Sequence, residues 1–291
     1  MALLGKGRQT IDMLVDPGSF RENVVGDFVI DSELGPPAVV GTGLVNGRET
    51  TILAIDAMKA NPRFRVVYSG VIGLEEAYKM ALAVYYTIES DKNEPADKKR
   101  QILLIVDTPG NAPGKFEEIV GMNKATASYQ LALAEARKAG HASVAMVIGR
   151  AISGAFLCHG LQADIVLSLT KEYNTMVHVM PVTSISRITK IPLEKLQELA
   201  KTNPVFASGA EFVYNLGGIN ELVKHEDSMR QIIIDSFSEI RKLRSSGQEE
   251  LLGPMGRVLL GTQRGGRTKM LEVIEKMHQE ADSALSDLKI V

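Results

Sequence analysis

Blocks of apolar residues recur along the chain with two different spacings, and their order predicts the type of fold. Continuous apolar runs, typical of strands buried on both faces, occupy residues 102–106, 143–148, 165–169 and 176–180. Apolar residues at helical spacing occupy residues 74–89 and 116–139, and a short helix is expected from about Gly154. Buried strands joined by helices pair in parallel through right-handed crossovers. The pattern therefore predicts an α/β fold.

The stretches before this region predict a hairpin and a docking segment. Two β-rich runs, Ala38 to Val45 and Thr50 to Ile55, are separated by Asn46-Gly47, the strongest short signal for a β-hairpin. The first ~30 residues mix charges with glycine and have no sustained period, so we expect a short docking helix followed by an irregular arm. Residues 91–100 are charged and contain a proline, as expected of a surface loop.

From Pro192 onward the pattern is almost entirely helical. Helices are predicted over residues 192–201, 208–216, 228–244 and 268–288. Gly253-Pro254 and Gly265-Gly266 interrupt this tail, and Gly140 is expected to cap the helix over residues 116–139. We therefore divide the chain into three parts: an N-terminal arm that docks (1–35), a main domain (36–224) and a helical tail for subunit association (225–291).

Composition and charge narrow the class of protein. With 291 residues, of which 45% are hydrophobic, the chain has the composition of a soluble globular protein. Its net charge of −2, with acidic and basic residues interspersed, offers no basic surface for nucleic acid or for an anionic membrane. No apolar run approaches the ~20 residues that a membrane helix requires, so we expect a cytoplasmic protein.

Two glycine-containing loops at strand ends form the candidate site. Residues 106–114 read VDTPGNAPG and residues 149–156 read GRAISGAF. Each loop follows a buried strand and leads into a helix, whose first amides have no intrahelical partner and favour negative charge. The amides of Gly154 and Ala155 lie at such a helix start, so the two loops are expected to form an oxyanion hole. Ordinary strand-to-helix turns are the alternative interpretation.

The motifs VDTPG…PG and GRAISGAFLCHGLQAD, within residues 101–181, resemble those of the crotonase superfamily. More narrowly, this stretch resembles the gamma subunit of malonate decarboxylase, which is similar to the C-terminal domain of acyl-CoA carboxyltransferases. The resemblance covers about residues 70–222. It implies a crotonase-like (ββα) spiral fold with a helical C-terminal extension.

The resemblance also implies a reaction and partners. Together with a beta subunit, the chain would complete a site that decarboxylates a malonyl thioester on an acyl-carrier protein or transfers its carboxyl group to biotin. No cofactor and no metal are expected on this chain itself. The prosthetic group of the acyl-carrier protein, or biotin on a biotin carrier, would come with the partners. The sequence leaves open the biotin dependence, the acyl substrate and the stoichiometry of the complex.

Residue roles follow from the resemblance position by position. Gly154 and Ala155 would supply the oxyanion amides, and Gly110 and Asn111 would line the opposite wall. The candidates for substrate binding are Ser153, Phe156, Asp107, Arg150 and His178.

Several of these polar residues also have a structural interpretation. Asp107 is expected to cap its loop through its carboxylate rather than to act as a general base, and Arg150 is expected to be a solvated arginine at a strand end. Cys158 is the single cysteine, which excludes an internal disulfide, and it has no partner at zinc-ligand spacing. We expect it to be a small buried side chain.

Two other functions compete with this one. A Clp-type serine peptidase shares the fold, and Ser153 and His178 would be its dyad. Ser153 stands directly before Gly154, however, whereas the peptidase pattern has one more residue there, and no carboxylate is obviously placed to orient His178. His159, six residues beyond Ser153, would point away from it on a helix. The other alternative is a non-catalytic scaffold subunit of an acyl-CoA carboxyltransferase, in which the helical tail would supply the docking surface.

Overall fold

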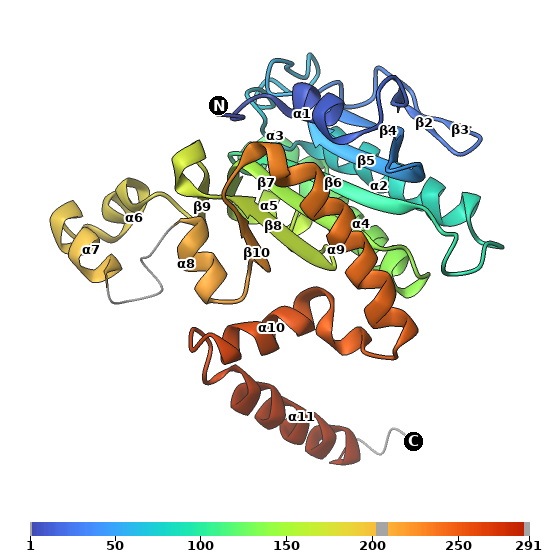
Figure 1. The fold of residues 1–291 in the computed structure, drawn as a ribbon. Coiled ribbons are helices and arrows are strands. Elements are labelled where there is room, and N and C mark those ends of the chain that lie inside the picture. The colour runs from blue at the N-terminus through green and yellow to red at the C-terminus, as the bar shows by residue number, and fades with distance from the viewer. Residues whose placement is uncertain (1, 202–208, 288–291) are drawn as a thin grey trace.

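The structure, a computed structural model, describes residues 2–201 and 209–287 and is built around one eight-stranded sheet (Figure 1). The strands follow the order β1-β4-β5-β6-β7-β8-β10, and β9 pairs with β7 beside this path. Their bounds are β1 Arg21–Glu22, β4 Ala38–Val45, β5 Arg48–Ile55, β6 Gln101–Thr108, β7 Ser143–Ile152, β8 Ile165–Leu169, β9 Met176–His178 and β10 Glu221–Val223. Strands β1, β4 and β5 pair antiparallel, and all pairs from β5 onward are parallel. The predicted α/β fold is confirmed.

The predicted hairpin is β4 and β5. Asn46 and Gly47 connect these strands with φ angles of 52° and 73°. Both central residues of a type I′ turn need positive φ, and asparagine and glycine tolerate that conformation best. The N-terminal arm contains the predicted docking helix, α1 (Gly7–Leu14), the edge strand β1, and a small second sheet of β2 (Val24–Val25) and β3 (Phe28–Val29).

Helices cover both faces of the sheet, because the side chains of each strand alternate between two apolar clusters. Ile102, Leu104 and Val106 of β6 belong to the cluster beneath α2 (Leu74–Ser90) and α4 (Met122–Lys138). Leu103 and Ile105 belong to the opposite cluster, beneath α1 and α9 (Met229–Ser245). Residues of a strand that is covered on both sides are apolar at every position, as the sequence showed. No helix among the described residues is long and apolar enough to cross a membrane.

Two predicted elements differ clearly from the structure. The helix expected over residues 116–139 is two helices, α3 (Lys115–Val120) and α4, because the backbone at Gly121 is left-handed, with a φ of 108°. Helix α4 ends at Lys138, one residue earlier than predicted, and Gly140 follows two residues later with a φ of 95°, which favours glycine. Strand β7 continues to Ile152 through Gly149, which the sequence assigned to a loop. The short helix that follows, α5 (Ser153–Cys158), is confirmed.

The C-terminal part is more varied than the predicted run of helices. Helix α7 (Leu193–Ala200) is confirmed, and so are α8 (Ala210–Asn215), α9 and α11 (Met270–Asp287). The predicted starting residue Ser208 and final residue Leu288 lie outside the described residues. Strand β10 and the helices α6 (Val182–Thr189) and α10 (Gly253–Gln263) were not predicted.

The predicted tail, residues 225–291, does not behave as one unit. Met229, Ile233 and Phe237 of α9 are buried in the main core, so this helix belongs to the body of the fold. Helix α10 packs on the body of the fold through buried Arg257 and Val258, and α11 lies beyond it, mostly exposed (Figure 1). The role of the tail in subunit association stays a prediction.

Candidate functional site

The two predicted loops meet at the carboxyl ends of β6 and β7. A Cβ atom added to Gly110, in the first loop, would lie 3.8 Å from the Cβ of Ser153 at the start of α5. A Cβ atom added to Gly154 would lie 2.5 Å from the Oδ1 of Asn111, too close for any side chain. Gly110 has a φ of 138°, which few other residues adopt. The sequence therefore predicted correctly which segments lie together.

The start of α5 presents backbone donors. Ser153 has a φ of 58°, and this left-handed residue turns the chain abruptly from β7 into the helix. The amides of Gly154 and Ala155 lie in the first helical turn, and neither donates to a group outside the helix among the described residues. Beside them, the buried amide nitrogen of Asn111 also lacks an acceptor in the described part of the chain. Three donor nitrogens beside the first loop are thus without an acceptor outside the helix among the described residues.

The first loop is held by backbone pairing. Ile72 donates its N–H to the carbonyl of Gly110 (3.1 Å) and accepts the N–H of Ala112 (3.0 Å). Together these bonds form a parallel bridge between Ile72 and Asn111. The Gly110 wall is therefore supported by the segment that leads into α2.

Asp107 and Arg150 form a buried ion pair behind the two loops. The Oδ1 of Asp107 accepts from the Nε of Arg150 at 2.9 Å, and the two side chains are 2% and 16% exposed. The expectation of a solvated Arg150 is therefore wrong. Asp107 does not cap its own loop either, because its carboxylate accepts hydrogen bonds from Arg150 and from the N–H of Gly5. The predicted contacts of both residues with substrate stay predictions.

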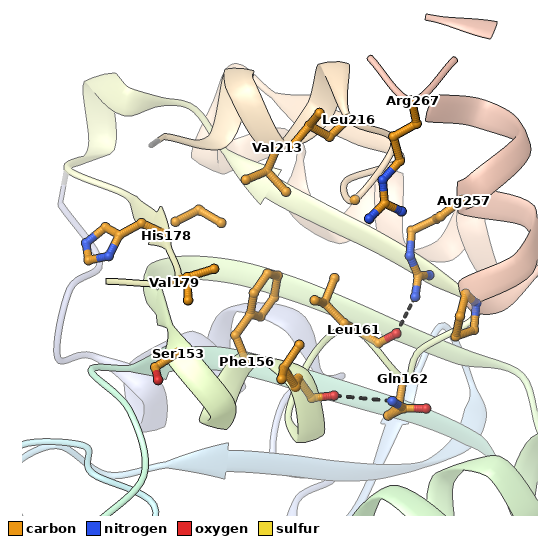
Figure 2. A pocket seen from close by; sticks show the side chains of 14 residues that line it. Ser153, Phe156, Leu161, Gln162, His178, Val179, Val213, Leu216, Arg257 and Arg267 are labelled. Atoms are coloured by element: carbon orange, nitrogen blue, oxygen red, sulfur yellow. Dashed lines mark hydrogen bonds between the residues drawn. The ribbon is translucent and has the colours of Figure 1, made fainter. Parts of the chain in front are cut away.

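Ser153 and His178 do not form a dyad in this structure. They lie on neighbouring segments, since Ile152 pairs with His178, yet no hydrogen bond joins their side chains among the described residues. Figure 2 shows the imidazole of His178 directed away from Ser153. Burial lowers the pKa of His178, and its Nδ1 has no partner in the described part of the chain, so no carboxylate orients the ring.

Cys158 is buried, as predicted, and His159 beside it is held by two hydrogen bonds to residues other than Ser153. The His159 ring is fully buried; its Nε2 donates to the carbonyl of Ile105 and its Nδ1 accepts from the hydroxyl of Tyr129, both at 2.9 Å. Because the carbonyl can only accept, Nε2 carries a proton in this arrangement. Burial lowers the pKa of His159 to about 4, and burial raises the pKa of the Cys158 thiol to about 12.

A cavity of about 360 Å³ opens beside α5. Ser153, Phe156 and His178 line one side of it, and most of its wall is apolar (Figure 2). Arg257 and Arg267, from the C-terminal part, line the other side. The guanidinium of Arg257 is buried and donates to the carbonyls of Ala163 and Leu161. Sequence reasoning missed both arginines because they lie about a hundred residues from the loop motifs and carry no motif of their own.

Comparisons with known proteins agree with this geometry. The family described as malonate decarboxylase gamma subunit matches residues 68–281. The chain is 60% identical over 279 residues to the malonyl-S-ACP:biotin-protein carboxyltransferase MADD of Malonomonas rubra, and the alignment covers 96% of each chain.

Solved structures point to the same family. A chain of the Pseudomonas malonate decarboxylase hetero-tetramer in complex with coenzyme A matches with a TM-score of 0.70 and 27% identity, over 94% of this chain and 99% of that one. A chain of the Pseudomonas MdcD-MdcE hetero-dimer matches with a TM-score of 0.65 and 29% identity, over 88% and 96%. Transcarboxylase 12S, at 19% identity and a TM-score of 0.63 over 83% of this chain and 42% of that one, shares the fold alone. The predicted crotonase-like fold is confirmed.

Proposed function

The chain belongs to the malonate decarboxylase gamma-subunit family, and we propose that with a beta subunit it transfers the carboxyl group of a malonyl thioester from an acyl-carrier protein to biotin on a carrier protein. The observation that carries the proposal is the 60% identity to a relative named for that transfer, over 96% of both chains. No serine nucleophile is needed, which agrees with the absence of a hydrogen bond between Ser153 and His178 in the described structure.

The donors at the start of α5 fit an oxygen atom that gains negative charge during the reaction. The amides of Gly154 and Ala155 and the side-chain amide of Asn111 are donors, and Gly154 has no side chain to block access. In the transfer, the bond between the carboxyl carbon and the α-carbon breaks, its electron pair remains on the acetyl thioester as an enolate, and the proton that the carbon gains comes from the biotin nitrogen that accepts the carboxyl group.

The contribution of this chain is electrostatic and geometric. Fixed N–H donors would bind the ureido oxygen of biotin more strongly as negative charge develops on it during loss of the N–H proton, and they need no reorganisation at that moment. Removal of one such donor typically lowers kcat by about a hundredfold, which corresponds to ~3 kcal/mol. Phe156 and the apolar cavity wall beside α5 exclude water, which strengthens these interactions. In this proposal Ser153 is a small wall residue.

Large apolar side chains near the site support a partner subunit. Phe116 and Ile119 of α3 are 61% and 72% exposed, and Leu157 and Val179 beside α5 are 52% and 81% exposed. Exposed apolar side chains in such number are typical of surfaces that another protein covers. We assign this surface to the beta subunit, which would supply the oxyanion hole for the thioester carbonyl, and we assign α10 and α11 to subunit association.

One assay tests the proposal. The chain is co-purified with its beta subunit and supplied with malonyl-acyl-carrier protein and a biotin carrier, and acetyl thioester, carboxylated carrier and carbon dioxide are measured. We expect the carboxyl group on the carrier and inhibition by avidin. Carbon dioxide release that ignores biotin and avidin would show instead a biotin-independent decarboxylase. Gly154→Val should abolish either reaction, because its side chain would collide with Asn111.

A further inference from the structure

The pairing of β6 and β7 changes register beside the site. Val106 pairs with Val147, but the next pair joins Thr108 to Ala151. Between these pairs β6 contributes one residue, Asp107, and β7 contributes three, residues 148–150. A bulge of this kind leaves backbone groups of the longer strand without partners in the ladder. Buried N–H groups need another acceptor.

The carboxylate of Asp107 fills this gap. Its Oδ1 accepts the backbone N–H of Arg150 at 2.9 Å, in place of the missing strand carbonyl. The guanidinium of Arg150 binds both carboxylate oxygens, at 2.9 Å and 3.3 Å, and the N–H of Gly5 binds Oδ2 at 2.6 Å. One buried side chain therefore connects β6, β7 and the N-terminal arm.

Two glycines leave the space that this arrangement needs. A Cβ atom on Gly149 would lie 2.7 Å from the Oδ1 of Asp107. A Cβ atom on Gly70 would lie 2.8 Å from the Nη2 of Arg150 and 3.1 Å from the carbonyl oxygen of Asp107. Both contacts are closer than side chains tolerate, so the ion pair and the glycines form one packed unit.

The bulge determines where α5 begins. After Arg150 the strand has two more residues, Ala151 and Ile152, before Ser153 turns into the helix. The register set at Arg150 therefore places the amides of Gly154 and Ala155 relative to the Gly110 wall. A displacement of about 1 Å between such groups can lower a rate by about a hundredfold.

We infer that Asp107 is a positioning residue: its carboxylate holds the bulge of β7 through the N–H of Arg150 and thereby aligns the oxyanion amides of α5 with the wall at Gly110. The inference rests on the proposed function of those amides. It assigns Asp107 a role through the strand in place of the predicted contact with substrate. Asparagine cannot replace the carboxylate, because its single oxygen leaves an NH₂ group facing other donors.

The opposite end of β7 offers a matched control. Asp164 is fully buried and, like Asp107, accepts the backbone N–H of a β7 residue, Ser143, at 2.9 Å. It also binds the guanidinium groups of Arg137 and Arg244, at 2.9 Å and 3.0 Å. The same substitution, aspartate to asparagine, therefore removes a comparable buried ion pair far along the strand from α5.

The test compares Asp107→Asn with Asp164→Asn in the complex with the beta subunit. The measurements are kcat and KM for malonyl-acyl-carrier protein and the thermal midpoint. For Asp107→Asn we expect kcat to fall about tenfold or more, with KM changed less than about threefold. For Asp164→Asn we expect a lowered midpoint and kcat within about twofold of wild type.

Two outcomes would overturn the inference while the wild-type complex remains active: an unchanged kcat in Asp107→Asn, or an equal loss of kcat in Asp164→Asn. If Asp107→Asn does not assemble with its partner, Gly149→Ala displaces the same carboxylate while retaining its charge and must lower kcat by itself. An inactive wild-type complex would count against the proposed function and not against the positioning role.

Discussion

The N-terminal and C-terminal ends of β7 are anchored by similar chemistry in different surroundings. At the N-terminal end, Asp164 binds Ser143 and the guanidinium groups of Arg137 and Arg244. At the C-terminal end, Asp107 binds Arg150 two residues before the strand ends at the amides of α5. The same kind of ion pair therefore stabilises the fold at one end of β7 and positions the amides of α5 at the other end.

The difference shows why burial and pairing alone do not identify a functional carboxylate. Each aspartate accepts four hydrogen bonds, and the exposed fractions of Asp107 and Asp164 are 1% and 0%. What distinguishes them is the segment that they hold. The bulge beside Asp107 sets the position of a helix start, whereas Asp164 joins two segments in regular register.

The largest expected effect comes from adding one methyl group at the C-terminal end. Gly149→Ala places its Cβ 2.7 Å from the Oδ1 of Asp107 and 3.0 Å from the Cδ1 of Leu4, so we expect kcat to fall about tenfold or more and stability to fall by about 1–3 kcal/mol. Gly140→Ala is the control near the other end: its φ of 95° costs about 1 kcal/mol, and kcat should not change. Steady-state kinetics and thermal unfolding of the two variant complexes test this difference. Equal kcat values for Gly149→Ala and Gly140→Ala would contradict it.

Low pH should lower the stability of the fold, because a buried neutral histidine lies near each end of β7. Burial lowers the pKa of His159, below the site, to about 4, and burial also lowers the pKa of His141, beside the other end. The unfolded chain binds a proton near pH 6.5 and the folded chain does not, so stability falls as pH drops from about 6.5 towards 4, by on the order of 3 kcal/mol for His159.

Thermal midpoints of the complex between pH 7 and 4.5 test this dependence. His159→Gln should flatten the curve over that range, and His225→Gln, at an exposed position, should leave it as in wild type. A curve for His159→Gln that remains as steep as wild type would show that other groups carry the pH dependence.

A smaller effect is expected from shortening the N-terminal arm. Deletion of residues 1–5 removes the N–H of Gly5 from Asp107, so kcat should fall about threefold, because Arg150 still holds the carboxylate. Leu3→Ala, which removes a buried side chain but keeps the Gly5 hydrogen bond, should lower the thermal midpoint and leave kcat unchanged. Identical kinetics for the deletion variant and the wild type would show that the N-terminal arm does not contribute to the geometry of the site.

The smallest effect is expected at Ser153. An oxyanion site built from backbone amides should retain kcat within about threefold in Ser153→Ala, whereas a serine peptidase would lose nearly all activity. Because the φ of Ser153 is 58°, Ser153→Gly should raise stability by up to about 1 kcal/mol. Loss of carboxyl transfer in Ser153→Ala with an intact thermal midpoint would assign chemistry to the hydroxyl.

Local sequence patterns predicted the strands and loops around the site and missed the contact between Asp107 and Arg150 that connects them. Neighbouring residues alone predicted the apolar runs of β6 and β7, the helix start at α5 and the two glycine-containing loops. Gly149 and Arg150 looked like a loop because neither favours a strand, but an acceptor 43 residues away, Asp107, keeps them in β7. Pairing across such a separation leaves no mark in the spacing of apolar residues.

The same limit explains the other differences. The break at Gly121 depends on one left-handed residue inside a continuous helical pattern. Helix α10 begins at the pair Gly253-Pro254, which the sequence analysis interpreted as an interruption. Arg257 reaches the cavity wall only through tertiary packing. The roles of Gly154 and Ala155 come from the resemblance and stay predictions.

The bridge between Ile72 and Asn111 has a thermodynamic consequence. The amides of Ile72 and Ala112 are bonded across it, so they should exchange slowly with solvent deuterium. A wall that is already ordered by its own backbone loses little conformational entropy when a ligand arrives. Association at this wall should therefore have a small entropic penalty, and calorimetry of ligand binding should show little of the signature of coupled folding.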